Sequence, residues 1–171
     1  MQDVTKRVKM FKVLFVVYLI ALFEIVVFKF DIPFSNMGYL RSVNFIPFNQ
    51  SLIVNGKIEL SEIFMNMVIF IPLGVYFEII FSKWSTMKKF FIVFVVSLSC
   101  EILQFIMAVG ASDITDVINN TLGGIVGVLI IKLLVRLFKD KNKVYKFINI
   151  VATAGTVFMI SLLSMILLYN R

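Results

Sequence analysis

Between Glu101 and Gly127, acidic and amide side chains interrupt sequence that is otherwise apolar enough to span a bilayer. The residues of this kind are Glu101, Gln104, Asp113, Asp116, Asn119 and Asn120. Carboxylates can act as acids, bases or ligands, and carboxamides can both donate and accept hydrogen bonds. Because ionisable groups at membrane depth are costly, they usually face a bundle interior or a wet cavity. The stretch therefore marks a candidate functional site.

Several of these side chains recur at helical spacing, where residues three or four apart share one face. The faces are Ser97, Glu101, Gln104 and Ala108 in one segment; Asp116, Asn120, Gly123 and Gly127 in the next; and Glu62, Asn66 and Phe70 in an earlier one. Small residues let a neighbouring helix approach closely, and Pro72 should kink its helix or release a backbone carbonyl. We expect the three faces to be buried against one another.

The composition requires a membrane environment. Hydrophobic residues make up 60% of the 171 residues and charged residues 16%, and the mean hydropathy is +0.99. The chain has no His and a single cysteine, Cys100, which argues against zinc chemistry, Ser or Cys triads and disulfides. We expect no cofactor and no dedicated metal site. The net charge of +7 is carried in short blocks beside apolar segments, which indicates membrane topology and not nucleic-acid binding.

Five apolar segments are long enough to span a bilayer, which needs about 20 residues. We predict spans at Met10 to Phe28, Ile63 to Phe81, Phe90 to Val109, Val117 to Phe138 and Phe147 to Tyr169. Lys and Arg cluster before the first span, between the second and third, and between the fourth and fifth, whereas the turn from Gly110 to Asp116 has none. The positive-inside rule therefore predicts a cytoplasmic N-terminus and an extracellular C-terminus. Glu78, near the cytoplasmic side, is expected to pair with Lys83.

The depth of the acidic residues follows from the helical rise. At about 1.5 Å per residue, Glu101 lies roughly 18 Å above Lys89, past the middle of a hydrocarbon core about 30 Å thick. Asp113 and Asp116 lie further out, so a polar pocket should open toward the outer leaflet. The alternative is that single residues such as Gln104 only join helices by hydrogen bonds, each contributing about 1 kcal/mol.

The connection from Phe30 to Leu60 contains the apolar run Asn44 to Phe48. It is too apolar for an ordinary solvated loop, so it either lies in the outer interface or re-enters the bundle, with a plain loop as the alternative. The predicted fold class is an all-α, polytopic integral membrane helix bundle of about five transmembrane helices. We expect residues 1–171 to form one domain.

Four ordered motifs resemble those of the VanZ-like family. They are the runs Asn44 to Phe48, Asn66 to Gly74, Glu101 to Gln104, and Asp113 to Gly124, and the resemblance covers about Val43 to Gly127. Many relatives carry Arg after the glycine that matches Gly110, whereas this chain has Ala111. The stretch from Gly110 to Asp116 is similar to the member linked to teicoplanin resistance.

The resemblance implies a multi-pass protein of the bacterial plasma membrane that is linked to resistance against teicoplanin and related lipoglycopeptides, without an assigned reaction. The functional positions that it implies are Asn44, Pro47, Asn66, Pro72, Glu101, Gln104, Asp113, Asp116 and Asn120.

Three functions remain open. A binding protein would hold an outer-leaflet lipid, a cell-wall precursor or a lipidated antibiotic in the acidic pocket. An intramembrane enzyme would use Glu101 and Asp116 as acid and base on a lipid-linked substrate, with a divalent cation held by carboxylate and carboxamide oxygens. A transporter would relay protons along the acidic residues, although the chain shows no inverted repeat. The expected partners are membrane lipids and no nucleic acid.

Overall fold

The computed structural model describes residues 2–28, 40–48, 53–54, 57–58 and 61–169. The helices in this part of the chain are α1 (Gln2–Val27), α2 (Ser61–Ile80), α3 (Thr86–Met107), α4 (Ile114–Phe138) and α5 (Lys141–Tyr169). All five are long and apolar enough to cross a membrane, so the predicted helical fold class and the number of spans are confirmed. The helices begin earlier than the predicted spans because the flanking polar residues continue the backbone hydrogen bonding beyond the apolar segment.

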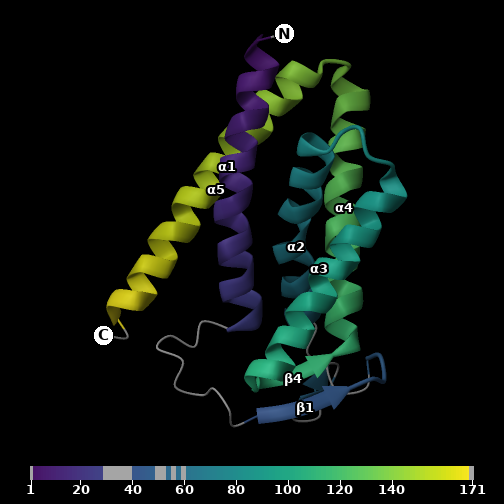
Figure 1. Cartoon of the computed structure of the whole chain (residues 1–171), viewed down its shortest axis with the longest axis vertical. Helices are drawn as coiled ribbons and strands as arrows, with labels where there is room; N and C mark the ends of the chain where they lie inside the picture. Colours follow the sequence, from purple (N-terminus) through teal and green to yellow (C-terminus); the bar gives the residue numbers. More distant parts are fainter. Residues whose placement is uncertain (1, 29–39, 49–52, 55–56, 59–60, 170–171) are drawn as a thin grey trace.

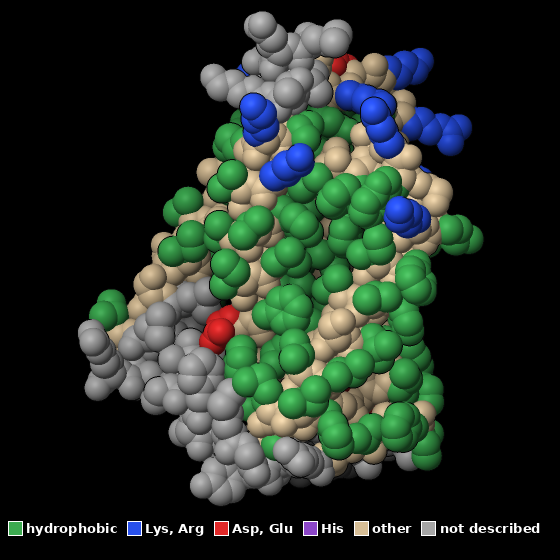
Figure 2. Space-filling view, viewed as in Figure 1, with side chains coloured by type: hydrophobic (Ala, Val, Ile, Leu, Met, Phe, Trp, Pro, Cys, Tyr) green, Lys and Arg blue, Asp and Glu red, His purple; other side chains and the backbone are tan. Residues whose placement is uncertain are grey.

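Successive helices run in alternating directions, so the N-terminus, the α2–α3 turn and the α4–α5 turn meet at one end of the bundle (Figure 1). Lys and Arg side chains gather at this end, and the flanks below it are mainly hydrophobic (Figure 2). We call it the basic end, and the opposite end the acidic end. The segregation of charge agrees with the sequence pattern, and the side of the membrane that each end faces stays a prediction.

Helices α2 and α4 are in backbone contact, and three glycines make this possible. A Cβ added at Gly123 would lie 2.0 Å from the carbonyl oxygen of Met67, and one added at Gly127 would lie 2.0 Å from that of Ile71. One added at Gly74 would meet the Gly124 carbonyl oxygen at 1.8 Å. Helix α3 packs on α4 beside this contact, since Val93 lies against Gly124. Small residues therefore set the distance between α2 and α4, as expected for tight membrane interfaces.

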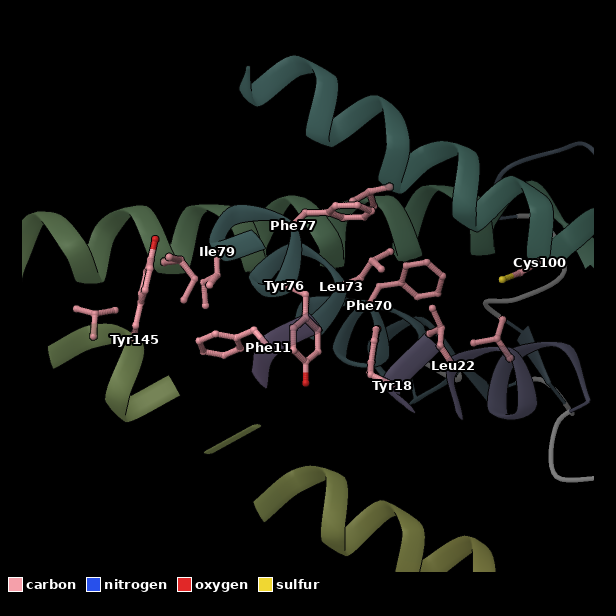
Figure 3. Close-up of a cluster of buried hydrophobic side chains, with 14 of the residues drawn as sticks. Phe11, Tyr18, Leu22, Phe70, Leu73, Tyr76, Phe77, Ile79, Cys100 and Tyr145 are labelled. Atoms are coloured by element: carbon pink, nitrogen blue, oxygen red, sulfur yellow. The ribbon is translucent and has the colours of Figure 1, made fainter. Parts of the chain in front are cut away.

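Aromatic side chains fill the core between α1, α2 and the start of α5 (Figure 3). The ring of Phe11 lies 6.3 Å from those of Tyr76 and Tyr145, edge to face, and Tyr18 lies 5.4 Å from Tyr76. The Tyr18 hydroxyl donates a 2.7 Å hydrogen bond to the carbonyl of Ile69, one turn before Pro72 within α2. The buried phenol thus obtains a hydrogen-bond partner from the backbone of α2.

An ion pair joins α2 to α3 near the basic end. Lys89 Nζ lies 2.7 Å from Glu78 Oε2, and the Lys89 side chain is only 2% exposed. The predicted pairing of Glu78 with Lys83 was wrong. Lys89 lies on α3, whereas Lys83 is exposed in the turn between α2 and α3. A buried ammonium requires a charged partner more strongly than an exposed one does.

At the acidic end, two short strands pair in parallel, which the sequence did not predict. Strand β1 (Leu40–Asn44) pairs with β4 (Val109–Asp113), with Asn44 opposite Asp113. Two further strands, β2 (Ile53–Val54) and β3 (Lys57–Ile58), form an antiparallel pair. The predicted turn from Gly110 to Asp116 is therefore a strand followed by the first turn of α4. Buried backbone groups between spans need hydrogen-bond partners, and a distant strand supplies them here.

Strand β1 lies across the ends of the helices (Figure 1), and the side chains of Phe45 and Ile46 after it are 79% and 61% exposed. This placement favours the interfacial reading of the Asn44 to Phe48 segment over re-entry into the bundle. The remainder of the connection, apart from β2 and β3, comprises residues 30–39, 49–52, 55–56 and 59–60 and lies outside the described residues.

Candidate functional site

Asp113 is the centre of the hydrogen-bond network at the acidic end. It is the N-cap of α4: its Oδ1 accepts a 2.7 Å bond from the backbone N–H of Thr115. Its Oδ2 accepts a 3.0 Å bond from the amide of Asn44, and its own backbone N–H donates to Oε2 of Glu101 at 3.0 Å. An aspartate after a strand suits this position because its carboxylate satisfies an N–H that the helix start leaves unpaired.

Asn44 and Thr115 hold the apolar segment against this network. Oδ1 of Asn44 accepts a 3.1 Å hydrogen bond from the backbone N–H of Ile46. Oγ1 of Thr115 accepts a 3.0 Å hydrogen bond from the backbone N–H of Phe48. Phe48 adopts a positive φ of 62°, which turns the chain at the end of the segment. The exposed side chains of Phe45 and Phe48 therefore extend from a backbone segment that is held by hydrogen bonds.

Glu101 and Ser112 join the end of α3 to β4. Glu101 is 5% exposed, and its backbone carbonyl accepts a 2.7 Å bond from Oγ of Ser112. Between them Ala108 takes a left-handed φ of 51°, which ends α3 and directs the chain into the strand. Sequence reasoning missed Ser112 and Thr115 as members of this network, although both flank Asp113 in the motif that was recognised.

A cavity of about 330 Å³ lies beside the network. The polar residues that border it are Asn44, Glu101, Ser112 and Asp113, and the apolar residues include Val43, Phe45, Ile102 and Phe105. The surface that faces the cavity is almost entirely apolar, so the cavity suits an alkyl chain, with the hydrogen-bond network beside it for the head of an amphiphile.

Asn120 lies deeper in the bundle and is fully buried. Neither its Oδ1 nor its Nδ2 has a hydrogen-bond partner among the described residues, and the same is true of Nδ2 of Asn119. One turn along α4, Gly123 touches α2 and Gly124 touches α3, so this level of α4 lies where the three helices meet. Because an unpaired buried amide costs about 1–3 kcal/mol, Asn120 is suited to hold water or a ligand group.

The side chain of Gln104 does not line the cavity and is hydrogen-bonded to α1. Its Nε2 donates a 2.9 Å bond to the carbonyl of Val26, which links α3 to α1, while its Oε1 is buried without a partner among the described residues. Ser97, on the same predicted face, donates to the carbonyl of Val117 at 3.4 Å. The helix-joining reading of these polar residues therefore fits Gln104 and Ser97.

The structure brings together Asn44, Glu101 and Asp113 around one cavity. Asp116 is buried in the first turn of α4 at 7% exposure, one turn before Asn120. Asn66 is half-buried on α2, Pro47 is exposed, and the side chain of Glu62 lies outside the described residues. No group of three or more acidic, His or Cys residues that could hold a metal was found in the described part of the chain.

Comparison with known proteins identifies the family. The VanZ/LLP1 family model matches residues 15–139, most of the chain. The chain belongs to the VanZ/LLP1 family. It is 40% identical over 116 residues to Protein VanZ of Enterococcus faecium, an alignment that covers 67% of this chain and 68% of that protein. No solved structure matches.

The recognised VanZ-like motifs lie inside the family match, together with β1, β4 and the cavity. Helix α5 begins at Lys141, just beyond the matched residues. The VanZ/LLP1 match thus contains every residue predicted for the site, from Asn44 to Asn120.

Proposed function

We propose that this VanZ-family protein is a non-enzymatic binding protein of the bacterial plasma membrane, and that it contributes to teicoplanin resistance. Its ligand is an amphiphile: an outer-leaflet lipid, a lipid-linked cell-wall precursor or the lipid-bearing part of the antibiotic. The polar head lies at Glu101, Asp113 and Asn44, and the alkyl part lies along Phe45 and Phe105.

The apolar cavity beside the polar network of the acidic end carries this proposal. Its volume of about 330 Å³ is in the range of small-molecule sites, and its polar groups are positioned by hydrogen bonds to the backbone. Phe45 lines the cavity, and the side chains of Ile46 and Phe48, which follow it in the chain, are exposed, so apolar surface is available near the cavity at the membrane interface.

The same geometry disfavours the enzyme hypothesis with Glu101 and Asp116 as acid and base. Glu101 lines the cavity, whereas Asp116 is not among the described residues that line it. The second carboxylate in the cavity is Asp113, and its two oxygens already accept from Thr115 and Asn44. General acid–base catalysis requires both groups within hydrogen-bond reach of one substrate.

Expression in a susceptible Gram-positive host tests the proposal. Teicoplanin carries an acyl tail and vancomycin does not, so tolerance to teicoplanin should rise much more than tolerance to vancomycin. Phe48→Asp should reduce the difference, because a charge at this exposed position disturbs how the segment from Asn44 to Phe48 lies at the interface. Equal protection against both drugs would contradict the proposal. A lipid of altered mass in the expressing strain, absent when Glu101→Gln replaces the wild type, would instead support the enzyme.

A further inference from the structure

A second cavity, of about 380 Å³, lies among helices α1, α2 and α5. Its lining includes Tyr18 and Leu22 of α1, Val75 and Tyr76 of α2, and Val151 and Gly155 of α5. None of the described residues that line it is charged, and none lines the cavity at the acidic end. Helix α5 begins beyond the residues that the VanZ/LLP1 model matches, so one of the three walls is not part of that match. We call this space the α5 cavity.

The α5 cavity exists because α5 is not packed closely on α2. A Cβ added at Gly155 would meet nothing within 4 Å, whereas one added at Gly74 would lie 1.8 Å from the backbone of α4. Small residues in membrane helices usually let a neighbouring helix approach closely. The link between α2 and α5 is instead the side chain of Tyr76, which is directed toward α5 (Figure 3) and is hydrogen-bonded to the side chain of Thr156. Gly155 therefore borders open space.

The dimensions of the α5 cavity fit one hydrocarbon chain and exclude a helix. Its lining extends from Ile148 to Met159 on α5 and from Tyr18 to Ile25 on α1, which corresponds to about 16 Å and about 10 Å of helix. Spread over these lengths, the volume of about 380 Å³ gives a width of roughly 5–7 Å. A hydrocarbon chain is about 4 Å across, the distance at which carbon atoms touch. A helix with its side chains is about 10–12 Å across.

The surroundings of the α5 cavity indicate that hydrocarbon fills it. Val151 is 51% exposed and Gly155 is also exposed, so the cavity opens at the surface of the bundle. Both residues belong to the apolar span Lys141–Leu162, so the opening faces the hydrocarbon core. The hydroxyls of Tyr18 and Thr156 already donate to backbone carbonyls, and a bound water needs several polar partners. Empty space would leave the lining atoms without dispersion contacts.

We propose that the α5 cavity binds one straight acyl chain of a membrane lipid. The chain lies between α5 and α2, against Gly155 and Val75, and the lipid headgroup lies outside the cavity. A methyl-branched isoprenoid chain is wider than a straight chain and fits the narrow part of the cavity less well. The site is separate from the cavity at the acidic end and does not depend on the function proposed for it.

Photo-crosslinking of the purified full chain in detergent tests the site. The probe is phosphatidylcholine with a diazirine in the middle of a palmitoyl chain, added in equimolar amount so that detergent covers most of the lateral surface. Peptide mass mapping should find the label on Val75 and Gly155 in preference to Phe158, which is 70% exposed but does not line the cavity. If Phe158 is labelled as strongly as Val75, or if Val75 is unlabelled because a helix closes the cavity, the proposal is overturned.

Variants of α5 separate the cavity from general contact with lipid. Gly155→Phe fills the cavity, so the label on Val75 should be lost. Ala154→Phe is the matched control and should keep this label, because Ala154 is exposed on the same helix and does not line the cavity. Val151→Phe narrows the cavity from the same wall and should lower the label on Val75, even if Gly155→Phe fails to fold. Unchanged labelling in Gly155→Phe, or equal loss in Ala154→Phe, would contradict the site.

Competition identifies the type of chain. Unlabelled dipalmitoyl phosphatidylcholine should displace the probe from Val75, and a polyisoprenyl phosphate should displace it less well. Stronger competition by the isoprenoid would overturn the assignment to a straight acyl chain.

Discussion

The side-chain amide of Asn44 donates a 3.0 Å hydrogen bond to Oδ2 of Asp113, a residue 69 positions later in the chain. Through this bond the end of β1 is fixed to the start of α4, and both residues border the same cavity. The apolar segment after Asn44 is thereby held at the acidic end of the bundle, in contact with the network that includes Glu101.

Exchanging these two side chains tests whether their pairing organises the acidic end. Asn44→Asp places a second carboxylate against Asp113 and should destabilise the protein by about 2 kcal/mol or more, because a hydrogen bond is replaced by like-charge repulsion. The double variant Asn44→Asp with Asp113→Asn should recover most of this loss, since Asn also caps helices. Thermal unfolding in detergent measures the effect, and additive losses in the double variant would rule out direct coupling.

The glycine contact between α2 and α4 predicts a strong position dependence of alanine substitution. Gly123→Ala and Gly127→Ala each place a methyl group 2.0 Å from a carbonyl oxygen of α2, so the helices must separate, at a cost of about 1–3 kcal/mol. Gly155→Ala is the matched control, because nothing lies within 4 Å of the added Cβ and Ala favours the helix by up to about 1 kcal/mol. The melting temperature should fall in Gly123→Ala and in Gly127→Ala. It should stay level or rise in Gly155→Ala. Equal effects at all three sites would contradict the close contact.

The buried ion pair at the basic end should be sensitive to loss of either partner alone. Lys89→Met leaves Glu78 without its 2.7 Å partner and should cost about 3 kcal/mol, whereas Lys89→Met combined with Glu78→Gln should cost much less. Lys83→Met, at the exposed position in the turn, serves as the control and should change stability by less than about 0.5 kcal/mol. If the double variant is no more stable than Lys89→Met, the pair is not coupled.

The candidate site predicts a variant that keeps the fold but loses function. Glu101 lines the cavity, and Glu101→Gln still accepts from the backbone N–H of Asp113, so membrane abundance should stay near wild type. Loss of a hydrogen bond to a charged group corresponds to about 1.5–3 kcal/mol, or tenfold or more in affinity. Teicoplanin tolerance should therefore fall. Asn149→Asp, a buried amide on α5, is the control and should keep tolerance. Full tolerance of the Glu101→Gln variant at wild-type abundance would remove the site.

Cysteine labelling tests the predicted orientation, with the N-terminus in the cytoplasm. In a Cys100→Ala background, Ser42→Cys is suitable for the acidic end because Ser42 is exposed on β1, whereas Ser112 is buried. A membrane-impermeant maleimide should label it in intact cells. Asn142→Cys, in the first turn of α5 at the basic end, should react only after permeabilisation. The reverse pattern would show that the bundle is inverted.

The sequence alone determined the class of the protein, its five helices and the separation of basic from acidic residues. These features depend on composition and on short-range spacing, because any segment of about 20 apolar residues in a bilayer must satisfy its backbone as a helix. The four motifs were likewise sufficient for recognition of the family, which the family match confirmed.

Only the tertiary structure decided which polar residues act together. Asn44 and Asp113 meet because β1 and β4 pair in parallel, and Glu78 meets Lys89 and not Lys83 because Lys89 is buried on α3 whereas Lys83 is exposed in the turn. Gln104 was predicted to share the site, yet its amide reaches Val26 on α1. Helical spacing assigns residues to a face but does not say which neighbour covers that face. That choice depends on how closely the helices approach, which the glycines of α2 and α4 set here through contacts 50 or more positions apart in the chain.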